Sequence, residues 1–398
     1  MTATRLDTEK QGVSRATAID TAVEAEVEGE LVGLRDTFSR HDREETYFRL
    51  AVRRFRKSIA GMIGLVLVAM LVLMSIFADF LAPINPKAPY LAFAPPTKVS
   101  FFDAEGRFHL RPFYYPVIET GEFDPVTFQP LTGPDLENPR DISFFVKGYP
   151  YHLFGFIPLD IHLFGTEDGG PLHLLGTDKF GRDILSRGLV GSRISLTIAL
   201  IVVSITTLVG TLVGITSGYI GGRFDGWTQR FVDVVLAFPQ LPMYLALATL
   251  IPVTASSTFF LAFVIAVMAA LGWAQLSREV RGKTLALARI EYVLAATAVG
   301  ASDFRIIRRH ILPNVISHVI VAVTLAIPTV VLLESFLGFL GFAVKPPLIS
   351  WGLMLQDTNT FSVIGSYPWI LSPVVFVLIT VFAFNALGDG LRDAVDPY

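Results

Sequence analysis

The sequence predicts an all-α polytopic membrane protein with six transmembrane helices, one at the N-terminus and five in a core, and a small, partly β insertion outside the membrane. Hydrophobic residues make up 52% of the chain, charged residues 17%, and the mean hydropathy is +0.55, which places most of the mass in lipid. Long apolar stretches recur along the chain, and basic residues gather beside some of them. A stretch of roughly a hundred residues rich in Pro, Tyr and Phe follows the first apolar stretch and is too long for a simple connector.

Composition also excludes several classes of protein. The formal net charge of −3 argues against a nucleic-acid partner. The chain has no cysteine, which excludes disulfides, cysteine-ligated zinc, iron–sulfur centres and thiol nucleophiles.

The N-terminal part is expected to be a disordered cytoplasmic tail followed by an anchor. Residues 1–48 are polar, carry more acidic than basic side chains and contain few aromatic residues. Residues 49–82 contain a basic segment and the first span, at about 59–82, and no removable signal peptide is expected before it. The positive charges just before this span predict that the N-terminus is cytoplasmic. These charges are Arg53, Arg54, Arg56 and Lys57.

Residues 83–187 are predicted to form a small folded insertion on the extracytoplasmic side. The segments KVSFF, DAEG and RFHLR predict a β-hairpin over residues 98–111. Residues 151–165 mix aromatic and turn residues, which indicates another small sheet or an interfacial element. Four histidines lack the close spacing of metal ligands, so we interpret them as scattered surface residues and predict no metal site. They are His109, His152, His162 and His173.

Residues 188–398 are predicted to form the core, with five further spans. These lie at about 194–219, 231–253, 257–275, 318–342 and 369–387, and a short basic loop, residues 221–230, joins the first two. Pro239 and Pro242 interrupt the second of these five. Proline is tolerated in a span where neighbouring helices or a cavity satisfy the freed carbonyls, so both are candidates for lining a translocation pathway. A kink that merely helps packing is the alternative.

A polar, basic loop at about 276–317 separates two of the core spans. It carries most of the arginines of the core, whereas the connection after the next span has only Lys345. This asymmetry predicts that the loop is cytoplasmic. With the N-terminus inside and six crossings, the C-terminus is expected to be cytoplasmic too.

The loop contains a pattern typical of helix, tight turn and helix. Gly300 suits the position after a helix end because glycine reaches positive φ without a Cβ clash, so a helix is expected to stop near Val299. Ser302 and Asp303 supply N-cap and first-turn chemistry for a second short helix, which Pro313 is expected to break. The pattern alone is equally typical of an ordinary solvated connector.

Motifs for catalysis are not found. Gly282, Lys283 and Thr284 resemble the end of a phosphate-binding loop, but Ser277 stands where that loop needs glycine, and no strand precedes it. No enzyme active site is therefore expected. Glu334 is the one acidic residue well inside a predicted span. A carboxylate in hydrocarbon costs several kcal/mol unless it faces a cavity or a partner, so Glu334 is a candidate pathway residue. A protonated or hydrogen-bonded packing contact is the alternative.

The stretch YVLAATAVGASDFRIIRRHILPN, residues 292–314, resembles the cytoplasmic EAA signature of ABC importer permeases. Two positions depart from that signature: Leu294 stands where it has Glu, and His310 where it has Ile. LLGTDKFGRDILSRGLVGSRISL, ESFLGFLGF, PLISWGLMLQD and GDGLRDAVDP are similar to the C-type permease subunit of dipeptide and oligopeptide importers. The matching positions of the signature are Ala295, Ala296, Gly300, Leu312 and Pro313.

The resemblance implies an importer permease that does not hydrolyse ATP, located in the bacterial cytoplasmic (inner) membrane. Its expected partners are a homologous B-type permease, two ATP-binding subunits that carry ATP and Mg, an extracytoplasmic peptide-binding protein and membrane lipid. No cofactor is expected on this chain. The ATPase-coupling residues that the resemblance implies are Glu291, Tyr292, Ala295, Ala296, Gly300, Ser302, Asp303, Leu312 and Pro313.

Other functions stay open at this point. Related permeases that share these signatures carry nickel, oligosaccharides or antibiotic peptides. A secondary transporter or channel that acts without ATP, and a membrane enzyme or scaffold, are further alternatives.

Overall fold

The computed structural model describes residues 47–103, 105–123, 125, 130–252, 254–342 and 344–395. The predicted disordered tail, residues 1–48, therefore lies almost entirely outside the described residues. The chain divides into two units, Met1–Arg54 and Phe55–Tyr398. The described part of the first unit belongs to the basic helix α2 (Tyr47–Phe55), and everything that follows concerns the second unit.

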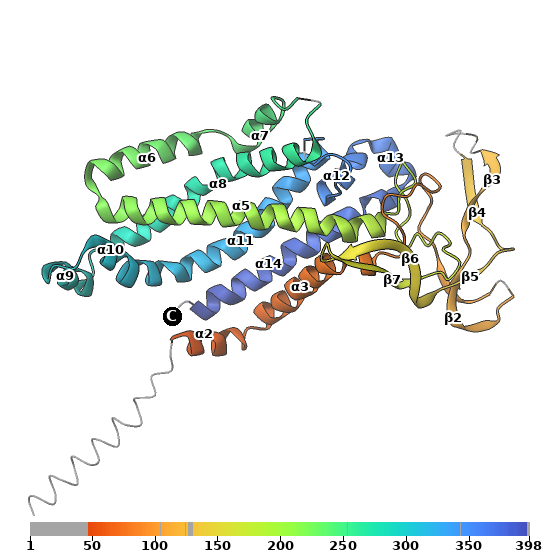
Figure 1. The fold of residues 1–398 in the computed structure, drawn as a ribbon, viewed down its shortest axis with the longest axis horizontal. Helices are drawn as coiled ribbons and strands as arrows, with labels where there is room; N and C mark the ends of the chain where they lie inside the picture. The colour runs from red at the N-terminus through yellow and green to blue at the C-terminus, as the bar shows by residue number, and fades with distance from the viewer. Residues whose placement is uncertain are drawn as a thin grey trace, which may run out of the picture. The chain divides into compact units, whose positions relative to one another are not determined.

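The second unit is mostly helical, as predicted (Figure 1). Among the described residues, five helical stretches are long and apolar enough to cross a membrane. They are α3 (Ile59–Ile76), α5 (Ile184–Ile220), α8 (Ser257–Leu287), the stretch Asp303–Phe339 that ends with α11 (Leu312–Phe339), and the stretch Pro368–Val395 that ends with α14 (Pro373–Val395). The helices α6 (Gly222–Ala237) and α7 (Gln240–Ala248) meet at 75° and make either a sixth, broken span or a re-entrant loop.

Several helices differ from the predicted spans. The loop expected at residues 221–230 is part of α6, and the third span is broken at Pro239, which is the N-cap of α7 and has no N–H to continue α6. Helix α8 continues beyond residue 275 to Leu287, because charged side chains on one face do not interrupt a helix that emerges from lipid. Helix α5 begins at Ile184, where the Asp183 side chain caps it by accepting the Ser186 N–H.

The described residues of the insertion form three small antiparallel sheets, which confirms the expected hairpin and the sheet alternative for residues 151–165. The predicted first hairpin pairs β1 (Val99–Phe102) with β2 (Phe108–Tyr114), and the short β5 (Arg140–Asp141) extends it. Strands β3 (Val117–Phe123) and β4 (Pro130–Pro134) form a second sheet. The third is a long hairpin of β6 (Ser143–Leu153) and β7 (Ile157–Gly165). The strands gather at one end of the long helices, and α9 (Glu291–Ala298) lies at the opposite end (Figure 1).

Glycines allow a close contact between two long helices of the core. Gly210, Gly214 and Gly218 recur every fourth residue on one face of α5, and this face lies against α8. A Cβ at these positions would lie 2.8, 2.6 and 2.9 Å from carbonyl oxygens of Trp273, Ser277 and Arg281. Small residues at this spacing allow two helix backbones to approach closely in a membrane. Gly64 of α3 approaches the backbone of α14 in the same way.

Candidate functional site

The candidate in the polar, basic loop is a compact turn between two short helices. Helix α9 ends at Ala298, Val299 is its C-cap, and Gly300 has φ +80°, so the predicted helix end and turn are confirmed. The Gly300 N–H donates to the Thr297 carbonyl, and the Ala301 N–H donates to the Ala296 carbonyl. These two bonds form a Schellman motif, which satisfies carbonyls that the helix end would leave free. Helix α10 (Asp303–Ile306) follows at once.

Apolar side chains fix the inner face of this hairpin to the long helices. Val293, Ile306 and Ile311 are 1%, 0% and 0% exposed, and they share one buried cluster with Ile215 of α5 and Val280 of α8. The Tyr219 hydroxyl at the end of α5 also donates to Asp303 Oδ1 at 3.0 Å. The hairpin is therefore anchored to the same pair of helices that the glycine contact joins.

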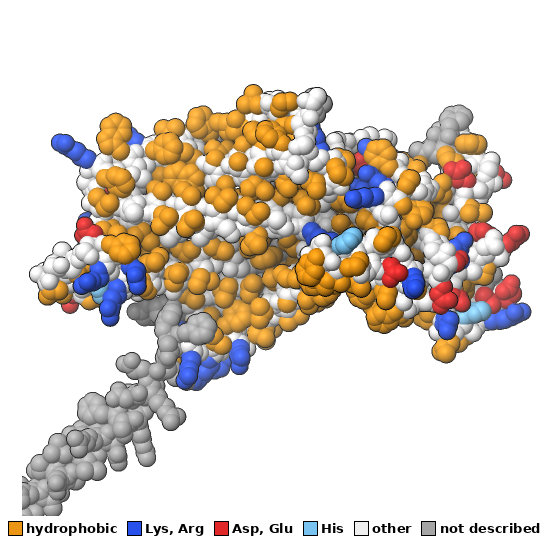
Figure 2. Space-filling view, in the orientation of Figure 1, with side chains coloured by type: hydrophobic (Ala, Val, Ile, Leu, Met, Phe, Trp, Pro, Cys, Tyr) orange, Lys and Arg blue, Asp and Glu red, His pale blue; other side chains and the backbone are white. Residues whose placement is uncertain are grey.

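The outer face of the hairpin is apolar and exposed. Val299 at the turn is 85% exposed, Phe304 72%, and Leu294 54%. Arg305, Arg308 and Arg309 lie beside them and are also exposed. Blue side chains gather at this end of the molecule (Figure 2). Exposed apolar side chains with a basic rim, on a turn whose other face is rigidly packed, are typical of a protein-binding surface.

The structure places the predicted coupling residues in this hairpin, except Leu312 and Pro313, which begin α11, and their exposures differ. Glu291 is in the first turn of α9, and Ala295 and Ser302 are exposed. The Tyr292 hydroxyl accepts from Asn314 Nδ2 at 3.3 Å, and its ring lies 5.8 Å from that of His310. His310, which departs from the signature, therefore contacts another residue of this chain. Leu294, the other departure, has an exposed side chain. Ser302 is the N-cap of α10, but its side chain makes no capping hydrogen bond.

The prediction that Pro313 breaks the second helix is wrong. The chain stays helical from Asp303 to Phe339, and the segment Ile307–Ile311 before the proline is a π-helix. The Leu312 N–H donates to the Ile307 carbonyl, five residues back. This wider turn relieves the conflict between the proline ring and the preceding carbonyls, so the helix continues. Helix α10 of the hairpin therefore continues into α11 without a break.

An ion pair stabilises the helices behind the hairpin. Arg281 of α8 donates from Nε and Nη2 to both carboxylate oxygens of Asp225 in α6, at 2.6 and 2.5 Å. The Ser217 hydroxyl of α5 donates to the same carboxylate. A two-pronged arginine pair of this kind fixes orientation as well as distance. Sequence reasoning misses it, because the charge of Arg281 serves there only to indicate the membrane topology.

The pathway candidates occupy two different settings. Pro239 and Pro242 lie at the start of α7, where the third span bends by 75°. Both are exposed within this chain. Glu334 of α11 is 0% exposed, and its Oε2 accepts from Ser195 Oγ of α5 at 3.1 Å. Ser195 Oγ in turn accepts the N–H of Trp351, the first residue of α12 (Trp351–Leu355).

The enclosure of Glu334 favours the packing interpretation, while its pathway role stays a prediction. We expect Glu334→Ala to lower the stability of the folded subunit by about 1–3 kcal/mol, because the Ser195 hydroxyl loses its buried acceptor. Glu334→Gln keeps an acceptor oxygen and the volume, and should retain both stability and uptake. Thermal unfolding and solute uptake of the reconstituted transporter measure the two effects. A stable Glu334→Gln variant without uptake would instead assign Glu334 to the pathway.

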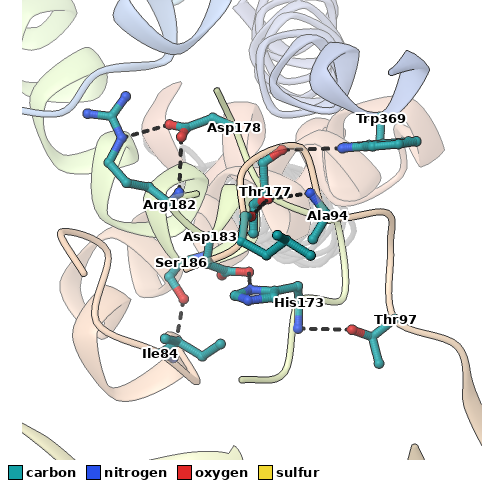
Figure 3. Close-up of polar contacts among 11 residues, drawn as sticks. Ile84, Ala94, Thr97, His173, Thr177, Asp178, Arg182, Asp183, Ser186 and Trp369 are labelled. Atoms are coloured by element: carbon teal, nitrogen blue, oxygen red, sulfur yellow. Dashed lines mark hydrogen bonds and ion pairs between the residues drawn. The ribbon is translucent and has the colours of Figure 1, made fainter. Parts of the chain in front are cut away.

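Sequence reasoning also misses a network of hydrogen bonds at the start of α5 (Figure 3). Thr177 Oγ1 donates to the Leu91 carbonyl at 2.6 Å and accepts the Ala94 N–H at 2.7 Å. Asp183 is fully buried and lies 3.1 Å from His173 Nδ1. Burial and the Asp183 carboxylate raise the pKa of Tyr90, whose ring packs on His173. This hydrogen-bond network holds the segment around Leu91 and Ala94, which follows the first span, against the start of α5.

The histidine interpretation is wrong for two of the four residues. His173 and His162 are 5% and 0% exposed, whereas His109 and His152 are exposed. His162 Nδ1 lies 2.8 Å from the Asp79 carbonyl and Nε2 lies 3.0 Å from the Tyr149 carbonyl, so the ring links the β6–β7 hairpin to α4 (Ala78–Leu81). Within the described residues, no group of acidic or histidine side chains is arranged to hold a metal ion.

Comparison with known proteins identifies the chain. Residues 210–398 match the binding-protein-dependent transport system inner membrane component, and residues 46–96 match the N-terminal TM domain of oligopeptide transport permease C. The oligopeptide permease OppC of Bacillus subtilis is 41% identical over 226 residues, which are 56% of this chain and 72% of OppC. The dipeptide permease DppC of the same organism is 39% identical over 56% of this chain and 68% of DppC. The glutathione permease GsiD of Shigella dysenteriae is 40% identical over 56% and 72%.

The fold and these matches define a multi-pass permease of the inner membrane, from a transport system that depends on a binding protein. Within that class, the chain belongs to the OppC/DppC family of ABC peptide importers, as its sequence resemblance predicted. It is a non-catalytic permease component. Membership of such a system implies ATPase and binding-protein partners.

Proposed function

We propose that this permease translocates short peptides that an extracytoplasmic binding protein delivers. The relatives named for oligopeptide, dipeptide and glutathione transport support a peptide-like substrate, and they differ in the length of peptide that their names state. The substrate passes between this chain and a homologous B-type permease. Two ATP-binding subunits, which carry ATP and Mg, drive the transition between two arrangements of the permease pair.

The two-faced hairpin α9–α10 carries this proposal. Its inner face is locked to α5 and α8 by buried Val293 and Ile306, and its outer face exposes Val299 and Phe304. An ATPase subunit that receives the outer face in a cleft moves the hairpin as a rigid body. The unbroken helix from Asp303 to Phe339 then transmits the movement toward the membrane-spanning part of the chain.

The proposed topology places the hairpin and both termini in the cytoplasm, and the insertion, residues 83–187, outside. The basic residues of the hairpin and the basic helix α2 support this orientation. The proposed organisation keeps the boundaries predicted from the sequence, with residues 49–82 as the anchor and 188–398 as the permease core.

Single cysteines test the topology and the partner together, because the natural chain has none. Phe304→Cys in intact cells should resist a membrane-impermeant maleimide, and Leu110→Cys, at a site in β2 that is 87% exposed, should react. In permeabilised cells, a cysteine-reactive photo-crosslinker at residue 304 should capture the ATPase subunit, identified by mass spectrometry of the tagged complex. Labelling of residue 304 from outside would reverse the topology, and absence of an ATPase adduct would contradict the coupling role.

A further inference from the structure

The β6–β7 hairpin ends in an apolar tip with an unusual backbone. Phe154 and Gly155 have φ +54° and +82°, and the Phe156 N–H donates to the Leu153 carbonyl. Positive φ at both central residues of a hairpin turn favours asparagine, aspartate or glycine at these positions. A phenylalanine in the left-handed region costs about 1–2 kcal/mol. The chain thus places a bulky ring where local preference opposes it, which points to a contact that the ring makes.

Ring contacts connect this hairpin to the end of the first span. The Phe154 ring lies 6.4 Å from that of Phe77, edge to face. Phe145 of β6 also has positive φ, +57°, and its ring lies 6.4 Å from that of Phe80. Phe77 and Phe80 directly follow α3. Both strained phenylalanines therefore lie beside the end of α3.

A polar contact fixes the same hairpin to α5. Arg193 of α5 donates to the Ser75 and Ile76 carbonyls at the end of α3 and to the Asp79 carboxylate. The Tyr149 hydroxyl of β6 lies 3.4 Å from Asp79 Oδ1, and burial together with Asp79 raises the pKa of Tyr149 well above its ordinary value. The hairpin is thus held at one height relative to the helices.

The hairpin leaves a large apolar surface uncovered. Phe144, Phe145, Phe154 and Phe156 are 67%, 67%, 58% and 72% exposed, and the tip, residues 153–157, carries no charge. A groove of about 700 Å³ adjoins it, lined by apolar side chains of α3 and α14 together with Phe77 and Phe80. The orange surface of the helices continues onto β6–β7 and gives way to charged side chains farther along the insertion (Figure 2).

We propose that the β6–β7 hairpin lies in the outer interface of the bilayer, with Phe154 and Phe156 inserted among the lipid acyl chains beside the first span. Continuity with the membrane-facing surface of α3 selects lipid as the occupant. Exposed phenylalanine side chains are typical of segments that bury an apolar face at the boundary between headgroups and acyl chains. The insertion is thereby held against the membrane and does not move freely above it. The side of the membrane rests on the proposed topology, whereas the depth of the tip does not.

Nitroxide labels at single cysteines test this depth in the full transporter, reconstituted in phosphatidylethanolamine and phosphatidylglycerol vesicles. Phe156→Cys reports the tip, and Phe123→Cys in β3 is the matched control, since Phe123 is 65% exposed and belongs to a different sheet. β3 lies farther from the long helices than β6 and β7 do (Figure 1). At residue 156, collisions with oxygen should exceed those with a water-soluble nickel chelate, and at residue 123 the ratio should reverse.

A second variant separates a membrane contact from a merely tight turn. Phe154→Asn relieves the strained φ and removes the apolar ring. If the hairpin made no contact with lipid, the nitroxide at residue 156 should keep the same ratio of collisions in this variant. We expect the added Phe154→Asn change to shift that label toward the nickel chelate. An aqueous signal at residue 156 in the natural background overturns the proposal. A label inaccessible to both agents also overturns it, since this indicates a protein partner. Either result leaves the coupling role of the α9–α10 hairpin untouched.

Discussion

Gly300→Trp is expected to reduce substrate-stimulated ATPase activity to its basal level while the permease stays in the membrane. Gly300 has φ +80° at the end of α9, and a Cβ there meets no described atom within 4 Å. Strain of about 1–2 kcal/mol from the left-handed backbone cannot by itself detach a hairpin anchored by three fully or almost fully buried side chains. The loss therefore comes from the indole, which projects from the outer face into the space that the proposed ATPase cleft occupies.

Gly300→Asn is the matched control, because asparagine adopts the left-handed conformation at low cost and is small. It should keep most of the coupling. Both variants are measured in vesicles that contain the partner permease, the ATP-binding subunits and the binding protein, with the amount of assembled complex determined for each. Normal coupling in Gly300→Trp would show that the turn does not face the ATPase.

The turn itself could be predicted from the sequence because its determinants are local. Gly300 stands within a few residues of the backbone groups that it affects, and the Schellman bonds span six residues at most. The two departures from the signature needed the structure. His310 packs on Tyr292, a contact that sequence distance hides, and Leu294 lies on the exposed face.

Proline effects were harder to predict, because they depend on how the chain can adjust. Pro239 ends α6 and produces a 75° bend, whereas Pro313 leaves its helix intact. The difference lies in the residues before each proline. A π-turn accommodates Pro313, while Phe238 before Pro239 adopts an extended conformation at ψ 129°. A proline in a sequence therefore marks a local constraint whose outcome the neighbouring packing decides.

Long-range contacts account for the remaining errors. His162 and His173 resemble surface residues when only spacing is considered, yet segments from the first span and the insertion enclose them. The separation between His162 and its Asp79 partner is 83 residues. Composition and periodicity predict which stretches lie in lipid, and they carry no information on which insertion strand covers which helix end.

Gly214→Leu is expected to prevent α5 and α8 from packing and to abolish recovery of folded permease. Even a Cβ at this position would lie 2.6 Å from the Ser277 carbonyl oxygen and 2.8 Å from Val280 Cβ. Backbone atoms on α8 cannot rotate away as a flexible side chain can, so the helices must separate. Separation also exposes the buried cluster that holds the α9–α10 hairpin.

Gly282→Leu is the control on the partner helix. Gly282 belongs to α8 and is exposed, and a Cβ at this position would have no described atom within 4 Å, so leucine there meets no obstacle. Leucine also favours a helix over glycine by about 0.5–1 kcal/mol, which should keep or raise the unfolding temperature. Size-exclusion profiles and thermal unfolding in mild detergent compare the two variants. Equal recovery of both variants would mean that the α5–α8 contact tolerates separation. The hairpin would then need another anchor to move as a rigid body, because Val293 and Ile306 pack on residues of these two helices.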